Sequence, residues 1–193
     1  AGGTTTIDVP YIWIPASGEG AVYRYNTNTG ARAGPFNTGV NPNWPGTPGT
    51  APGASPSRTS VNAFDATLWV ANRGDPAPSG GVAHLDYNGN MICYGGVPGG
   101  PRAVAIDAAG DVWVGSYTGR TLYKFSGTEF APVSSNPKTC KLLLTLPIPG
   151  NPYGAATDNK NHVWVQGGGT IIEIDAATAQ IVNQYPVGAY GIT

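Results

Sequence analysis

The sequence of 193 residues predicts an all-β fold built from repeated four-stranded sheets. Glycine (29 residues) and proline (18 residues) are abundant, as many short strands joined by tight turns require. Four of the five tryptophans recur every 44 to 56 residues, each within two short apolar segments that flank a turn: Trp13, Trp69, Trp113 and Trp164. A strand-based repeat of about 40–50 residues is typical of a β-propeller. We therefore predict a β-propeller with almost no helix.

Each repeat is expected to contain four strands, with the tryptophan in the second. Three first strands open with proline and end in Asp or Asn (Pro56–Asn62, Pro101–Asp107 and Pro152–Asp158), and Thr4–Asp8 is a shortened counterpart. Residues 189–193 resemble the start of another first strand. The chain is thus predicted to be one domain, 1–193, with four blades at about 4–37, 56–95, 101–146 and 152–186, and the stub 189–193 of a fifth.

Two arrangements of these blades fit the sequence. In one, the stub 189–193 pairs beside the first blade and closes a small ring. In the other, the chain is part of a larger propeller, whose remaining blades lie outside this sequence or come from another copy. Because open blades expose apolar faces and sheet edges, we expect the chain either to close on itself or to assemble.

The segment 38–56 is a Pro- and Gly-rich connection that is unlike the repeats. Its prolines are incompatible with ladder pairing and favour an extended backbone. Two interpretations remain open: an ordered surface loop between the first two blades, or a docking arm that inserts Trp44 into a neighbouring surface or ligand.

Composition argues against nucleic-acid binding and against a membrane span, and it favours a secreted protein. Charged residues make up 11% and the formal net charge is −1, so no basic surface for nucleic acid is expected. No apolar run approaches the ~18 residues of a membrane span. The low Lys and Glu content, and a start at Ala-Gly-Gly that fits a removed signal peptide or a fragment, favour a secreted protein. In such a protein, Cys93 and Cys140 are predicted to form a disulfide.

Three motifs resemble one family of secreted bacterial propellers, the virginiamycin B lyase-like and NHL-like group. They are Trp69–Gly74 (WVANRG), Asp107–Val114 (DAAGDVWV) and Gly150–Gly154 (GNPYG). The resemblance covers the whole chain at the level of the repeat and implies the propeller fold. It also implies, for the lyase, a metal held by acidic and histidine side chains that follow the repeat tryptophans. Here the residues three positions after each tryptophan carry no carboxylate: Ala16, Asn72, Ser116 and Gly167.

Candidate catalytic residues are few. His84 and His162 lie on different strands of different blades, and a metal site needs convergent ligands. The Asx residues that end the first strands are explained by turn hydrogen bonds: Asp8, Asn62, Asp107 and Asp158. The sequence contains no phosphate-binding loop and no nucleophile elbow, so no cofactor is predicted.

A column of large side chains marks one mouth of the predicted channel. Arg102, Tyr153 and Tyr190 follow the start of their strands at the same position, and turn residues are expected to flank them: Arg58, Asn72, Arg73 and Tyr117. Arginine and aromatic side chains at a mouth suit glycans, anionic groups or a protein partner. The alternative is that these side chains only pack blade against blade.

These observations favour a non-enzymatic extracellular propeller that acts as a binding or self-assembling module, with itself, another protein or a glycan as its partner. The first alternative is a metal-dependent lyase or hydrolase that uses His84 or His162 together with Asp residues. The second is a glycan-binding lectin that uses the tyrosine and arginine column. An enzyme requires histidines and carboxylates within one pocket, whereas a lectin requires exposed aromatic rings with polar neighbours.

Overall fold

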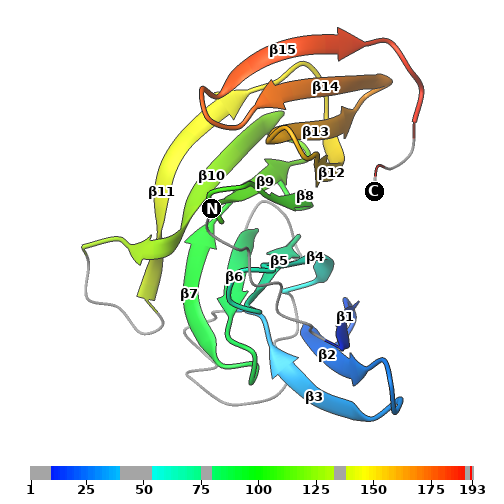
Figure 1. Ribbon diagram of the computed structural model, residues 1–193, viewed down its shortest axis with the longest axis vertical. Coiled ribbons are helices and arrows are strands. Elements are labelled where there is room, and N and C mark those ends of the chain that lie inside the picture. Colours follow the sequence, from blue (N-terminus) through cyan, green and yellow to red (C-terminus); the bar gives the residue numbers. More distant parts are fainter. Residues whose placement is uncertain (1–9, 40–53, 75–79, 133–137, 190–191, 193) are drawn as a thin grey trace, which may run out of the picture.

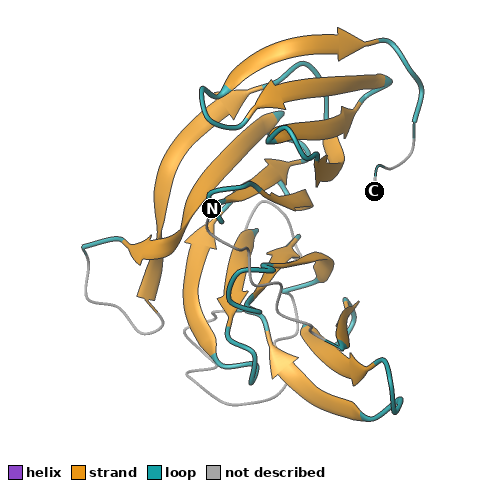
Figure 2. Cartoon of the chain, viewed as in Figure 1, coloured by secondary structure: helices purple, strands orange, loops and turns teal. Residues whose placement is uncertain are grey.

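A computed structural model describes residues 10–39, 54–74, 80–132, 138–189 and 192. Within these ranges the chain forms fifteen β-strands and no helix, which confirms the all-β prediction (Figure 2). The strands follow one another as antiparallel meanders arranged along an arc (Figure 1). No helix in the described part of the chain is long and apolar enough to cross a membrane. Trp44, Tyr190, the expected strand 4–8 and most of 189–193 lie outside the described residues.

Four meanders make up the described fold, and we number them in chain order. The first contains β1 (Tyr11–Ala16), β2 (Ala21–Asn26) and β3 (Arg32–Asn37). The second contains β4 (Pro56–Val61), β5 (Leu68–Asn72), β6 (Gly81–Leu85) and β7 (Met91–Gly96). The third contains β8 (Pro101–Ile106), β9 (Val112–Ser116), β10 (Thr121–Phe130) and β11 (Lys138–Pro147). The fourth contains β12 (Pro152–Thr157), β13 (His162–Gly167), β14 (Thr170–Asp175) and β15 (Gln180–Tyr185).

Asx turns connect the first strand of a meander to its second. The Oδ1 atoms of Asn62, Asp107 and Asp158 each accept a hydrogen bond from the backbone N–H two residues later, at 2.9–3.0 Å. Such bonds stabilise a tight turn without help from distant residues. The regular recurrence of these residues in the sequence therefore has a local structural cause.

The second and third meanders form one continuous eight-stranded sheet, which the repeat pattern did not predict. The extended end of β11 pairs in parallel with β7, through Lys138–Cys93 and Thr139–Tyr94. Beside this pairing, the predicted disulfide is confirmed: Cys93 and Cys140 are bonded, with Cα atoms 5.1 Å apart. Both cysteines are buried, so the bond lies inside the contact between the two meanders.

Three apolar clusters hold neighbouring meanders together. Trp13 packs in a cluster with Leu68 and Val70 of the second meander. Trp69 packs with Val112 and Val114 of the third, and Trp113 with Val163 and Val165 of the fourth. Each of these three tryptophans thus faces the meander that follows it in the chain.

Three of the four repeat tryptophans are buried. Trp13, Trp69 and Trp113 are 6%, 0% and 0% exposed, whereas Trp164 is only half-buried. The reason is positional, because the described chain places no following meander against the face that carries Trp164.

Candidate functional site

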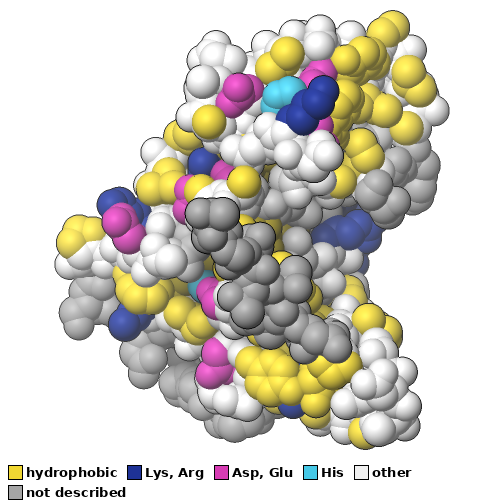
Figure 3. All heavy atoms as spheres, in the orientation of Figure 1, with side chains coloured by type: hydrophobic (Ala, Val, Ile, Leu, Met, Phe, Trp, Pro, Cys, Tyr) yellow, Lys and Arg dark blue, Asp and Glu magenta, His cyan; other side chains and the backbone are white. Residues whose placement is uncertain are grey.

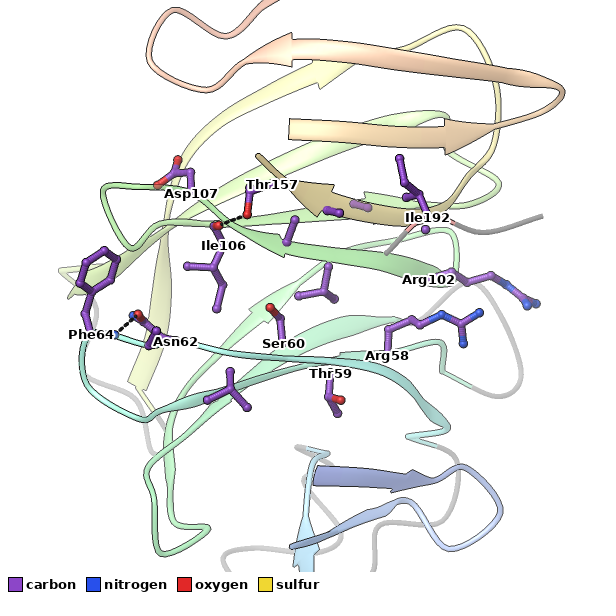
Figure 4. Close-up of a pocket in the computed structure, with 17 residues that line it drawn as sticks. Arg58, Thr59, Ser60, Asn62, Phe64, Arg102, Ile106, Asp107, Thr157 and Ile192 are labelled. Carbon is purple, nitrogen blue, oxygen red and sulfur yellow. Dashed lines mark hydrogen bonds between the residues drawn. The ribbon is translucent and has the colours of Figure 1, made fainter. Parts of the chain in front are cut away.

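A cavity of about 530 Å³ lies on the inner side of the arc, between the first strands of the second, third and fourth meanders. The strands β4, β8 and β12 run side by side along it (Figure 4). Its polar side chains belong to residues of these strands or of the turns that follow them: Arg58, Thr59, Ser60, Asn62, Arg102, Asp107 and Thr157. Arg58 and Arg102 lie at one end of the cavity, and Phe64 and Asp107 at the other (Figure 4).

The arginine end of the cavity is built by a repeated irregularity of the first strands. In β4, β8 and β12 the pairing register shifts at the residue after the opening proline, at Ser57, Arg102 and Tyr153. A bulge of this kind redirects a side chain out of the regular pleat. The sequence column that contains Arg102 and Tyr153 therefore reflects one backbone feature in successive meanders.

Two arginines and two tyrosines meet at this end, and we call them the Arg–Tyr rim: Arg58, Arg102, Tyr117 and Tyr153. The Arg102 guanidinium lies 4.8 Å from the centre of the Tyr117 ring and 5.3 Å from that of Tyr153. The Arg58 guanidinium lies 5.0 Å from the Tyr153 ring centre, and the two rings meet edge to face at 6.0 Å. Alternation of cations and rings holds all four side chains in a fixed order.

The charge of the rim is not neutralised by the described residues. No carboxylate of the described ranges forms an ion pair with Arg58 or Arg102, although Arg58 Nη1 donates to the carbonyl of Ser57 at 3.0 Å. Basic side chains are visible in the hollow on the open side of the arc (Figure 3). The rim therefore presents positive charge together with aromatic surface.

The remaining residues that the sequence placed at this mouth have different positions. Asn72 is buried at the end of β5, where its Nδ2 donates to the carbonyl of Thr38 at 2.5 Å. Arg73 is half-buried, and its backbone N–H donates to the backbone carbonyl of Ser55 at 3.1 Å. The structure thus brings Arg58, Arg102, Tyr117 and Tyr153 together, but does not bring the Asn72 side chain to the surface.

At the opposite end of the cavity, the carboxylate of Asp107 is fully occupied by structural partners. Its Oδ2 accepts from Trp113 Nε1 at 3.0 Å and lies 2.9 Å from Lys124 Nζ. Its Oδ1 accepts the backbone N–H groups of Ala109 and Asp111. A carboxylate whose two oxygens already face four donors is held in a fixed position, which is typical of a structural side chain.

The two histidines do not converge on the cavity. His84 lies in β6, stacked on the Trp69 ring at 4.0 Å, with its Nε2 2.8 Å from Thr67 Oγ1. Burial lowers the pKa of His84 to about 4, so the ring is neutral at pH 7. His162 lies in another sheet, in β13, where its Nδ1 is 2.8 Å from Glu173 Oε1.

The metal site that the lyase resemblance implies does not fit the residues present. The described ranges contain no group of three or more His, Cys, Asp or Glu side chains placed to hold an ion. The positions three residues after the repeat tryptophans also lack carboxylates, and Ser116 there donates to the carbonyl of Pro98 at 2.5 Å. The residues described at these positions therefore do not form a metal centre.

One regular feature was missed by reasoning on single residues. It is a contact between two positions that recurs in each meander. One position lies two residues before the tryptophan, and the other lies opposite the tryptophan on the next strand. The pairs Thr67–His84, Asp111–Lys124 and His162–Glu173 lie 2.8, 3.3 and 2.8 Å apart, and Tyr11 lies under the Arg24 guanidinium at 4.7 Å. Comparing the residues at these two positions in every repeat would have predicted the contacts, because chemically matched partners recur in each.

Comparison with known proteins places the fold but not the activity. No protein-family model matches the chain, and no curated protein matches its sequence significantly. Among solved structures, the chain is similar to virginiamycin B lyase from Staphylococcus aureus, with a TM-score of 0.70, 14% identity, and coverage of 95% of this chain and 56% of that one. It is similar to a gluconolactonase from Xanthomonas campestris, with a TM-score of 0.66, 14% identity, and coverage of 95% and 61%. The WD40 domain of Neurospora crassa Pan2 gives a TM-score of 0.63 at 13% identity, with coverage of 92% and 46%.

These similarities support the fold prediction. The chain has a β-propeller type of fold and resembles the virginiamycin B lyase-like propellers at that level. It spans roughly half to three fifths of the length of the structures named above. Identities of this size indicate shared architecture, and propeller architecture serves many unrelated functions.

Proposed function

We propose that the chain is an extracellular propeller module that binds, without catalysis, an anionic glycan at the Arg–Tyr rim. The observation that carries the proposal is the rim itself: two guanidinium groups are stacked on two tyrosine rings, and no described carboxylate pairs with either. A uronic-acid unit offers a carboxylate for the guanidinium groups and an apolar ring face for the aromatic side chains. The buried disulfide is compatible with an extracellular location.

The geometry supports binding of an extended ligand. The rim opens onto a cavity whose walls carry the hydroxyl groups of Thr59, Ser60 and Thr157. The hydroxyl of Thr59 donates to the backbone carbonyl of Trp13, and that of Thr157 donates to the backbone carbonyl of Ile106. Both side chains are therefore held in place. We propose that the charged group binds at the rim and that the next units of the ligand lie along β4 and β8.

In this proposal the four meanders are four blades. The cavity is part of the central channel of the propeller. The regular inner position of β4, β8 and β12 supports this assignment (Figure 4).

The test is calorimetric titration of the chain with a trimer of galacturonic acid, compared with the neutral trimer maltotriose. We expect binding of the acidic trimer alone, with an affinity that falls as salt rises because the contact is between charges. Arg102→Gln should weaken binding at least tenfold, and Tyr153→Ala by a similar factor. Lys160→Gln, which removes the same charge from an exposed turn outside the cavity lining, should leave binding unchanged. Equal weakening by Arg102→Gln and Lys160→Gln would refute a specific site.

The second candidate function is that of a lyase or hydrolase. It is favoured by the similarity to virginiamycin B lyase and to the gluconolactonase. It would be supported if the chain turned over virginiamycin B or a sugar lactone.

A further inference from the structure

The contacts between consecutive meanders follow one rule. The residues on either side of each tryptophan face the preceding meander, whereas the tryptophan faces the following one. Leu68 and Val70 flank Trp69 and pack on the cluster of Trp13, and Val163 and Val165 flank Trp164 and pack on that of Trp113. Each meander therefore has a leading face, formed by the flanking residues, and a trailing face, formed by the tryptophan.

The leading face of the first meander has no described partner. Ile12 and Ile14 flank Trp13 and are 51% and 45% exposed, whereas their counterparts in the other three meanders are completely buried. Tyr25 and Tyr23 pair with Ile12 and Ile14 on the neighbouring strand and extend this face. An exposed group of large apolar side chains of this kind is typical of an interaction surface.

The trailing face of the fourth meander is open as well. Trp164 is half-buried and stacks on Tyr185 at 5.7 Å, and Tyr185 is 38% exposed. Apolar side chains are visible at both ends of the arc (Figure 3). The two open faces thus correspond to the two sides of the contact that recurs three times within the chain.

Charge distinguishes this open pair of faces from the internal contacts. In two of the three internal contacts, the basic residue opposite the tryptophan donates to the next meander: Arg24 Nη1 to the carbonyl of Tyr87, and Lys124 Nζ to that of Ala176 at 3.2 Å. In the fourth meander this position holds an acid, Glu173, which accepts from Asn183 and Tyr185 and lies 2.8 Å from His162 Nδ1. An acid at this position favours a cation, rather than a carbonyl, on the partner surface.

The first meander carries a cation at the matching position. Met91 of β7 pairs with Leu85, and Ile181 of β15 pairs with Ile174. Both pack on the clusters shared with the preceding meander. Their counterpart in β3 is Arg32, which pairs with Tyr25 and lies 5.0 Å over the Tyr23 ring. Arg32 is thus on the leading face, where the preceding meander would present Glu173.

We infer that a second copy of this chain binds head to tail, with the trailing face of its fourth meander against the leading face of the first meander. Trp164 and Tyr185 pack on Ile12 and Ile14 in this contact, and Glu173 attracts Arg32. Each copy offers both faces, so two copies form a closed ring if the rotation between them closes, and a linear series of copies if it does not. The exposed apolar side chains of both faces become buried in the contact.

The test uses two variants whose changed residues are exposed. Ile14→Lys alters only the leading face, and Tyr185→Lys alters only the trailing face, beside Glu173. In sedimentation velocity at about 100 μM, we expect the unmodified chain to be a dimer or larger and each variant alone to be a monomer. An equimolar mixture of the variants should form a one-to-one complex, because the mixture restores one intact contact.

The two variants also distinguish head-to-tail binding from a contact between identical faces. If identical faces bound each other, the variant with the unchanged face would still self-associate when alone. Lys141→Ala, at an exposed site outside both faces, is the matched control and should associate like the unmodified chain. A monomeric unmodified chain at this concentration would overturn the inference. A mixture that remains monomeric, or association that both variants retain, would do so as well.

Discussion

Reduction of the Cys93–Cys140 disulfide should lower the stability of the chain by a predictable amount. The bond joins residues separated by 47 positions and restricts that loop in the unfolded chain. For a loop of this length, the entropy lost by the unfolded chain corresponds to about 4 kcal/mol at 25 °C. The two cysteines are 1% and 2% exposed, so the bond lies in the packed interior between the two meanders.

The measurement is equilibrium unfolding in guanidinium chloride, followed by tryptophan fluorescence, with and without dithiothreitol. A loss of about 4 kcal/mol should lower the unfolding midpoint by about 1 M for a protein of this size. The double variant Cys93→Ala/Cys140→Ala is the control, and its midpoint should not respond to dithiothreitol. Equal midpoints for the oxidised and the reduced protein would show that the loop argument is wrong for this chain.

Three other predictions concern buried or strained positions. Burial lowers the pKa of His84 to about 4, so between pH 6.5 and 4 the unfolded chain binds a proton that the folded chain does not. The free energy of unfolding should therefore fall by about 3 kcal/mol as the pH drops through that range, which urea titrations at each pH measure. The variant His84→Gln should flatten this pH dependence. Lys124→Met leaves the buried Asp107 carboxylate without its cation and should lower the free energy of unfolding by about 3–5 kcal/mol, measured by chemical denaturation. Lys141→Met, in an exposed pair, should lower it by less than about 1 kcal/mol. Similar losses for the two variants would contradict the role of burial. Ala179 has a φ of 57°, so Ala179→Gly should stabilise by about 0.5–1 kcal/mol, and a lowered melting temperature would contradict this account.

The strands were predictable because their signals are local. Proline at the start, an Asx residue at the end and alternating apolar residues between them depend on turn chemistry and on the pleat, which act within a few residues. The parallel pairing of β11 with β7 was not predictable, because it depends on where the extended third meander meets the second in space. The disulfide was predictable only because the chain contains two cysteines and no third.

The candidate site was predictable in part for the same reason. Arg102 and Tyr153 occupy one sequence column because the register shifts at the same place in β8 and β12. The burial of Asn72 could not be foreseen, because its partner, the carbonyl of Thr38, is 34 residues away and beyond a Pro-rich connection. Contacts between distant segments leave no periodic trace in a single sequence.

The three junctions between meanders differ in chemistry, and this gives the fold an uneven response to its surroundings. The first junction contains the hydrogen bond of Arg24, the second the Cys93–Cys140 bond, and the third the hydrogen bond of Lys124. A reductant acts on the middle junction alone, whereas the outer two combine an apolar cluster with the hydrogen bond of a cationic side chain. A change of redox state therefore alters only the middle junction, which keeps the β7–β11 pairing and the apolar cluster of Trp69 when the disulfide is reduced.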